Sequence, residues 1–165
     1  MISGGGGLYV DSSATATLTN CTLSGNSHYY GGGGGILVNN YAILNLTNTI
    51  VAGNTRYGGL YGWLPSDIYI FGAVGTADHN LVGDGWGSSG IVNGVNGNIV
   101  GGNPVINADL GPLQNNGGPT QTMALLAGSP AIGTADNALA PATDQRGVTR
   151  LNEAGETTDI GAFEL

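Results

Sequence analysis

The sequence predicts an all-β protein, specifically a right-handed parallel β-helix (a solenoid) of about three rungs closed by an irregular C-terminal cap. First, a glycine-led block over residues 4–27 is repeated over residues 32–55, with Gly7 matching Gly35 at a shift of 28 residues. Second, the segments inside each block alternate apolar and polar residues, which is the period of a strand. Third, helical periodicity is absent, and the many Gly, Thr and Asn residues disfavour helices. Strand-built repeats of this length are typical of solenoids, whose units bury their apolar faces by stacking on one another.

Each repeat contains equivalent strand segments. Four glycines lead into a short apolar segment at residues 8–10 and again at residues 36–38. A longer alternating segment follows at residues 14–20 and again at residues 42–48. We therefore expect the strands of one rung to lie over those of the next, at the spacing of about 4.8 Å found between paired strands.

Asparagines occur at equivalent positions where the predicted strands end. Asn20 corresponds to Asn48, and Asn26 corresponds to Asn54. In stacked rungs each amide can hydrogen-bond to the rung beside it and so satisfy polar groups that water does not reach. We therefore predict structural asparagine ladders, with Asn26 and Asn54 in one of them.

The second half of the chain departs from the repeat. Residues 56–66 are rich in aromatic residues and glycine, and we expect a loop insertion there before a strand at residues 67–71. Residues 80–84 resemble a third copy of the segment that ends each repeat. We expect the β-helix rungs over residues 1–102 and a C-terminal cap module over residues 103–165, because a solenoid needs its last apolar layer covered.

Several short motifs are similar to those of known bacterial surface proteins. Residues 33–36 (GGGI) and 23–26 (LSGN) resemble the paired motifs of polymorphic outer-membrane protein repeats. More specific motifs lie in the C-terminal part, at residues 103–104, 111–120, 125–132, 143–147 and 159–164. Together they resemble the choice-of-anchor Q module, which closes many secreted β-helix proteins of bacteria.

The resemblance implies an architecture and a location but no established reaction. It implies a secreted or cell-surface bacterial protein, and since the chain starts inside a repeat, we expect Met1 to begin a fragment of a longer parent. Two positions depart from the module, with Met123 where histidine is expected and Gly133 where aspartate is expected. Any ligand role of those positions is therefore not carried over to this chain.

Composition excludes several classes of partner. The chain has 165 residues, no lysine, three arginines and eleven acidic residues, with a formal net charge of −8. Binding to phosphates needs clustered cations, so we expect no nucleic-acid or anionic lipid partner. Cys21 is the only cysteine, which excludes an intrachain disulfide and a cysteine-based zinc site. No apolar run is long enough for a membrane-spanning helix.

Aromatic residues gather around the predicted insertion. Tyr29 and Tyr57 are related by the shift of 28 residues, and Tyr61 and Trp63 follow shortly after. In stacked rungs these four side chains would meet at one edge, where flat rings suit the apolar faces of sugars. The same rings would also serve as packing over the edge of the solenoid or against the cap. The sequence thus predicts a glycan-binding surface at Tyr29, Tyr57, Tyr61 and Trp63 and leaves the packing alternative open.

Three carboxylates in the third rung offer a catalytic alternative. Asp67, Asp78 and Asp84 lie in that rung, with His79 between them. Glycoside hydrolysis needs two carboxyl groups roughly 5–9.5 Å apart, which neighbouring rungs can supply. Acidic, carbonyl-rich loops would also suit calcium, although no EF-hand pattern occurs. We expect no metal centre and no cofactor, with calcium as the one ion that such loops would take.

One arginine is expected to have a structural role. Arg146 follows Asp144 and precedes Asp159 and Glu164 in a chain that has few cations. A guanidinium held between two segments can join them by bidentate hydrogen bonds. We therefore predict that Arg146 and Asp159 belong to a structural clamp.

These observations favour a structural or adhesive terminal module that binds glycans or a cell-surface polymer. The alternative is a polysaccharide-active enzyme, either a glycoside hydrolase or a lyase, that uses the carboxylates named above. The first rung would leave Leu8, Val10, Ala16 and Leu18 uncovered. An open strand edge is a template for another chain. We therefore expect end-to-end homodimers through this end, or an N-terminal segment folded over it.

Overall fold

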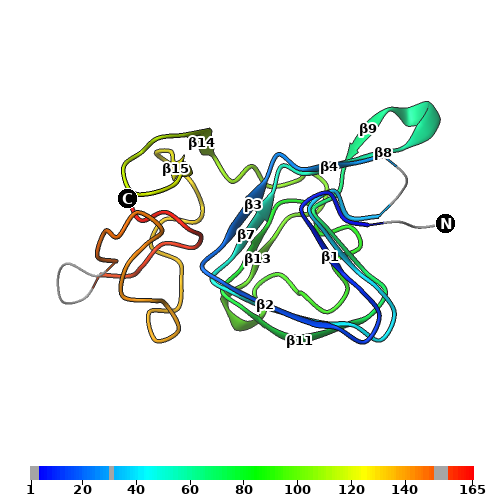
Figure 1. Cartoon of the computed structure of the whole chain (residues 1–165), viewed down its shortest axis with the longest axis horizontal. Coiled ribbons are helices and arrows are strands. Elements are labelled where there is room, and N and C mark those ends of the chain that lie inside the picture. Colours follow the sequence, from blue (N-terminus) through cyan, green and yellow to red (C-terminus); the bar gives the residue numbers. More distant parts are fainter. Residues whose placement is uncertain (1–3, 30–31, 151–155) are drawn as a thin grey trace.

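A computed structural model describes residues 4–29, 32–150 and 156–165, and the predicted starting residue Met1 lies outside these ranges. The described chain is all-β, and most of its sheets are parallel (Figure 1). The first sheet contains β1 (Leu8–Val10), β5 (Ile36–Val38) and β10 (Ile68–Ile70). The second contains β2 (Thr15–Thr19), β6 (Ile43–Thr47) and β11 (Ala73–Asp78). The third contains β3 (Thr22–Ser24), β7 (Ile50–Ala52), β12 (Leu81–Val82) and β13 (Ile99–Val100).

Strand register follows the sequence repeat. Leu8 pairs with Ile36 in the first sheet, a shift of 36 − 8 = 28 residues. The strands of the second and third sheets are displaced by the same amount from β2 to β6 and from β3 to β7. Beyond the insertion the shift becomes larger, since Ile68 pairs with Ile36. The chain therefore visits the three sheets in the same order on successive passes, and Figure 1 shows these passes lying over one another.

Glycine is required where adjacent passes come closest. A Cβ atom on Gly34 would lie 2.2 Å from the carbonyl oxygen of Thr55, and one on Gly6 would lie 2.2 Å from that of Gly34. Side-chain atoms cannot approach backbone so closely, so only glycine fits at this corner. The glycine runs that open each repeat are thus explained by the tight contact between passes.

The predicted loop at residues 56–66 contains regular structure, which corrects that prediction. A side sheet is formed by β4 (Ser27–His28), β8 (Thr55–Tyr57) and β9 (Trp63–Pro65). The last two strands form an antiparallel hairpin around the short 3₁₀ helix η1 (Gly59–Tyr61), and it projects from the body of the molecule (Figure 1). Its aromatic and apolar residues suit a strand, and β4 provides an edge for β8 to extend.

Hydrogen bonds join the asparagines at equivalent positions of the repeat. Asn48 Nδ2 lies 3.4 Å from Asn20 Oδ1, and both residues adopt the left-handed backbone conformation (φ +47° and +48°). Asn26 Nδ2 donates to Asn54 Oδ1 at 2.9 Å, and Asn54 Nδ2 donates to Asp67 Oδ1 at 2.8 Å. This second ladder therefore ends on a carboxylate.

The core has two parts. The interior between the three parallel sheets is filled by the inward residues of their strands, including Ile36, Leu44, Val51 and Ile68. Ile91, from the chain between β12 and β13, joins this interior cluster and is only 5% exposed. A second cluster lies on the outward side of the third sheet, where apolar residues are also present.

The described residues of the segment 103–165 pack on this outward face, so the predicted position of the cap is wrong. They include the antiparallel pair β14 (Leu110–Gln114) and β15 (Thr122–Leu125). The cluster contains Ile50, Ala52, Leu81, Ala108, Leu125, Ala131, Ala135, Ile160 and Phe163. Figure 1 shows the C-terminal segment beside β3, β7 and β13. The third sheet carries apolar residues on both faces, so its outward face also needs a cover, and the C-terminal segment provides it. The boundary between domains 1–102 and 103–165 stays a prediction.

The N-terminal end is only partly open. Val10 is 3% exposed, so the expectation that it lies uncovered is wrong. Leu8, Ala16 and Leu18 are half-buried and line a hollow of about 780 Å³, which Arg150 of the C-terminal part also borders. Pairing of two copies through this end stays a prediction. Light scattering of the Leu18→Lys variant over a concentration series would test it. In the described ranges no helix is long and apolar enough to cross a membrane.

Candidate functional site

Three of the four predicted aromatic residues meet beside the side sheet. The rings of Tyr29 and Tyr57 are stacked, with centroids 4.5 Å apart and planes 9° apart. The ring of Trp63 lies edge-on to both, at 5.5 Å from Tyr57 and 6.2 Å from Tyr29. Tyr29 follows β4 directly, and Tyr57 pairs with Trp63 across the hairpin. We call Tyr29, Tyr57 and Trp63 the aromatic edge.

The aromatic edge remains accessible although its rings pack on one another. Tyr29 is 53% exposed and Trp63 is 52% exposed. Tyr61 lies on η1 and is 82% exposed, but no ring contact joins it to the other three in the described structure. The rings therefore pack on one another, as the packing alternative predicts in part, and they still offer a flat apolar surface to a ligand.

A second aromatic cluster was missed by the sequence analysis. The ring of Tyr69 lies 4.8 Å from that of Phe71 and 5.3 Å from that of Trp86. The guanidinium carbon of Arg56 lies 4.6 Å from the centre of the Trp86 ring. Trp86 belongs to no repeat, so periodicity gives no signal for it. The outward position of Tyr69 in its strand was the one available indication of the cluster.

Asp67 is occupied by structural hydrogen bonds. It is 1% exposed. Its Oδ1 accepts hydrogen bonds from the backbone and side-chain nitrogens of Asn54, each at 2.8 Å, and its Oδ2 accepts one from the backbone nitrogen of Asp84 at 2.6 Å. Burial raises the pKa of Asp67, and these hydrogen bonds act in the opposite direction. This carboxylate therefore joins the segments around Asn54 and Asp84 and is not presented to a substrate.

The other two predicted carboxylates lie in different surroundings. Asp84 is 7% exposed, and its Oδ1 accepts a hydrogen bond from the backbone nitrogen of Trp86. Burial raises the pKa of Asp84, while the nearby Arg56 lowers it. Asp78 instead lies 2.6 Å from the ring nitrogen Nδ1 of His79. The structure thus brings Asp67 next to Asp84 and pairs Asp78 elsewhere, so the three do not form one catalytic group.

One group in the described ranges has the composition of a cation site. Asp78, His79 and Asp136 each offer one potential ligand atom, and these atoms lie within 4.8 Å of one another. All three residues are half-buried. The group contains a histidine, whereas calcium prefers oxygen ligands. This group therefore does not support calcium binding, and calcium binding elsewhere in the chain stays a prediction.

The predicted arginine clamp is present in part. Arg146 Nε donates to Asp144 Oδ2 at 2.8 Å, and a second guanidinium nitrogen donates to the backbone oxygen of Glu164. The guanidinium carbon also lies 3.6 Å from the centre of the Phe163 ring. Asp159 does not contact Arg146. It accepts hydrogen bonds from the backbone nitrogens of Gly133 and Leu165. Both residues tie the C-terminal part together, through separate contacts.

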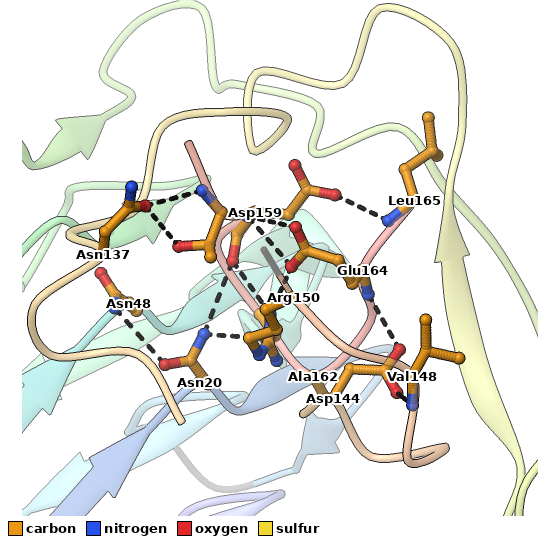
Figure 2. Close-up of polar contacts among 12 residues, drawn as sticks. Asn20, Asn48, Asn137, Asp144, Val148, Arg150, Asp159, Ala162, Glu164 and Leu165 are labelled. Atoms are coloured by element: carbon orange, nitrogen blue, oxygen red, sulfur yellow. Dashed lines mark hydrogen bonds and ion pairs between the residues drawn. The ribbon is translucent and has the colours of Figure 1, made fainter. Parts of the chain in front are cut away.

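Arg150 is the more deeply buried arginine, and the sequence analysis missed it. Its side chain is 2% exposed, and Nη1 donates to Glu164 Oε2 at 2.8 Å. Further hydrogen bonds reach the backbone oxygens of Asp159 and Gly161 (3.3 and 2.8 Å). Asn20 of the first rung also donates to the Gly161 oxygen, at 3.4 Å. Figure 2 shows Arg150 within the network that joins the C-terminal segment to the asparagine ladder.

Glu164 should make folding stability depend on pH. Burial, together with the nearby Asp159 carboxylate, raises the pKa of Glu164 to about 7, although Arg150 acts in the opposite direction. Between the ordinary value of 4.5 and about 7, the folded protein holds a proton that the unfolded chain releases. The unfolding free energy should therefore fall as pH rises through this window.

Urea denaturation at pH 5 and pH 7.5 measures this dependence. We expect the Glu164→Gln variant to lose less stability than the unchanged protein between these two pH values, because glutamine does not titrate. An equal loss in both proteins would contradict the assignment of this pH dependence to Glu164.

The sequence matches no family model, and no curated protein or solved structure is significantly similar to it. The candidate sites therefore rest on the geometry of this chain.

Proposed function

We propose that the chain is a right-handed parallel β-helix module of a secreted or cell-surface bacterial protein, with a structural or adhesive role, and that its aromatic edge binds glycans. The observation that carries the proposal is the cluster of the Tyr29, Tyr57 and Trp63 rings at the projecting hairpin, in which Tyr29 and Trp63 are half-exposed. The motifs that resemble the choice-of-anchor Q module support the bacterial surface location.

The chemistry of the edge suits sugar rings. Aromatic side chains offer a large apolar face at a low cost in conformational entropy, and tyrosine adds a hydroxyl group for polar contacts. Pyranose rings have one face rich in C–H groups, which packs on such a surface. The net charge of −8 disfavours polyanions, so neutral glycans are the better fit.

The rest of the molecule supports a scaffold. Parallel strands paired along the three sheets and the ladder through Asn26, Asn54 and Asp67 give a rigid body for presenting a surface. The alternative, a glycoside hydrolase or lyase, has less support. The Asp67 carboxylate is hydrogen-bonded to Asn54 and to the backbone of Asp84, and the Asp78 carboxylate is paired with His79. Release of reducing ends from a polysaccharide, abolished by Asp84→Asn, would favour the enzyme instead.

Substitutions at the edge test the proposal. On a panel of neutral glycans, Trp63→Ala and Tyr57→Ala should each weaken binding about tenfold, since a lost stacking contact is worth roughly 1 kcal/mol or more. The melting temperature should change little, because both residues lie on the projecting hairpin. Isothermal titration calorimetry measures the affinity.

Tyr41 offers a matched control away from the edge. It is 86% exposed and has φ +64°, so Tyr41→Asn removes an exposed ring and keeps a residue that tolerates this conformation. This variant should bind like the unchanged protein. If no neutral glycan binds, or if the two edge variants keep full affinity, the aromatic edge is not the binding surface.

A further inference from the structure

A hollow of about 860 Å³ lies next to Trp86, on the second aromatic cluster. Its wall includes Pro65, Asp84, Trp86, Ile91 and Val105. Successive residues of a strand point to opposite faces, so Arg56 of β8 lies on the opposite face of the side sheet from Tyr57. The hollow and the aromatic edge are therefore formed by different side chains. Its volume falls within the range of small-ligand sites.

Asp84 supplies an acceptor that the protein itself does not use. The residue is 93% buried (7% exposed), and its Oδ1 accepts a hydrogen bond from the backbone nitrogen of Trp86. In the described part of the chain, Oδ2 accepts no hydrogen bond, although Asp84 lines the hollow. Because Oδ2 is not used within the described protein and Asp84 lines the hollow, this oxygen can accept a hydrogen bond from a ligand hydroxyl.

Arg56 packs against Trp86 from outside the lining of the hollow. Its guanidinium carbon lies 4.6 Å from the centre of the Trp86 ring, and its Nε is buried without a hydrogen-bond partner. Among the described residues it is the one arginine without an ion pair within 4.0 Å. Arg56 lies near enough to Asp84 to lower the pKa of that carboxyl. The two charges offset each other, so the site as a whole favours neither cations nor anions.

Trp86 supplies the apolar surface. Its side chain is 53% exposed, and it forms part of the wall of the hollow. An exposed indole and a carboxylate acceptor together match a ligand that has an apolar face and hydroxyl groups at its rim. A pyranose ring has this combination, because each hydroxyl can donate one hydrogen bond and accept another.

We propose that this hollow is a second sugar-binding subsite, specific for neutral hexopyranoses, in which Trp86 stacks on the ring and Asp84 Oδ2 accepts a hydroxyl hydrogen, while Arg56 holds the Trp86 indole in position. It shares the ligand class of the proposed function but uses other residues, so either site can fail alone. Acidic sugars are disfavoured, because their carboxylate would approach Asp84 in a protein of net charge −8.

The chain contains two tryptophans, and each candidate site holds one of them. Trp63→Phe leaves Trp86 as the sole indole reporter of the hollow, and Trp86→Phe leaves Trp63 as the sole reporter of the aromatic edge. Each single-tryptophan protein is titrated with maltohexaose, cellohexaose and laminarihexaose, and with trigalacturonate as the acidic probe. Fluorescence emission then reports each site separately.

We expect at least one neutral hexaose to give a saturable change in Trp86 emission, and trigalacturonate to give none. In the Trp63→Phe background, Asp84→Asn should raise the dissociation constant at least tenfold. Asn keeps the acceptor for the Trp86 backbone but replaces the free oxygen by a donor. If Asp84→Asn does not fold, Arg56→Gln in the same background should weaken binding by a factor of about three or more.

The exposed Asp11 provides a matched control, because Asp11→Asn removes a carboxylate from the end of β1 and should leave the Trp86 titration unchanged. The proposal is overturned if no neutral hexaose changes Trp86 emission, if trigalacturonate binds more tightly, or if a folded Asp84→Asn variant keeps full affinity. A response at Trp63 alone would support the aromatic edge and reject the hollow.

Discussion

Replacing Arg150 by methionine should lower the unfolding free energy at pH 8 by about 3–5 kcal/mol, because at this pH the Glu164 carboxylate is ionised and is left buried without its cation. The substitution also removes hydrogen bonds to the backbone oxygens of Asp159 and Gly161. Since Gly161 is also bonded to Asn20, the loss should loosen the C-terminal segment from the first rung. Equilibrium urea denaturation measures the effect.

Two further variants separate the buried charge from general loss of packing. Arg150→Met combined with Glu164→Gln removes both charges, so it should recover part of the lost stability. Arg56→Met makes the same substitution at an arginine that has no ion pair, and it should cost less than about 1 kcal/mol. If Arg150→Met costs no more than Arg56→Met, Arg150 does not hold the C-terminal segment in place.

Replacing Asn54 by leucine should cost about 3 kcal/mol, because several buried partners lose their hydrogen bonds at once. Asn54 is 1% exposed. Its Oδ1 accepts from the backbone and side-chain nitrogens of Asn26, and its Nδ2 donates to the backbone oxygen of Leu23 and to Asp67. Thermal and urea unfolding both report the loss.

Asn45 is a matched control for this substitution. It also hydrogen-bonds to neighbouring strands, through Thr17 and Thr76, but on the exposed side of the second sheet. Water can replace those partners, so Asn45→Leu should cost less than about 1 kcal/mol. An unchanged unfolding midpoint for Asn54→Leu would show that the ladder contributes nothing to stability.

The two candidate sugar surfaces differ in how they arise. Tyr29 and Tyr57 stack because the repeat places them at equivalent positions of paired strands, with Trp63 brought in by the hairpin. Trp86 and Arg56 meet through tertiary contact between segments that share no repeat. Two separate surfaces on one molecule would allow a single polymer to be held at two points, which raises the overall affinity beyond that of either surface.

The sequence by itself determined the repeating part of this protein. A shift of 28 residues, together with strand alternation, is enough to align β1 with β5, β2 with β6 and β3 with β7. The same shift places Asn26 beside Asn54 and Tyr29 beside Tyr57. These contacts could be predicted because in stacked strands a position in the repeat fixes a position in space.

Only the tertiary structure decided what lies outside the repeat. The sequence did not reveal that Asp67 ends the asparagine ladder, that Arg150 is buried against Glu164, or that Trp86 lies under Arg56. The C-terminal segment covers the side of the third sheet, where Ile50 and Leu81 meet Ile160. Each of these contacts joins residues with no common period, and the choice among apolar faces depends on how much surface each contact buries, which local sequence patterns do not encode.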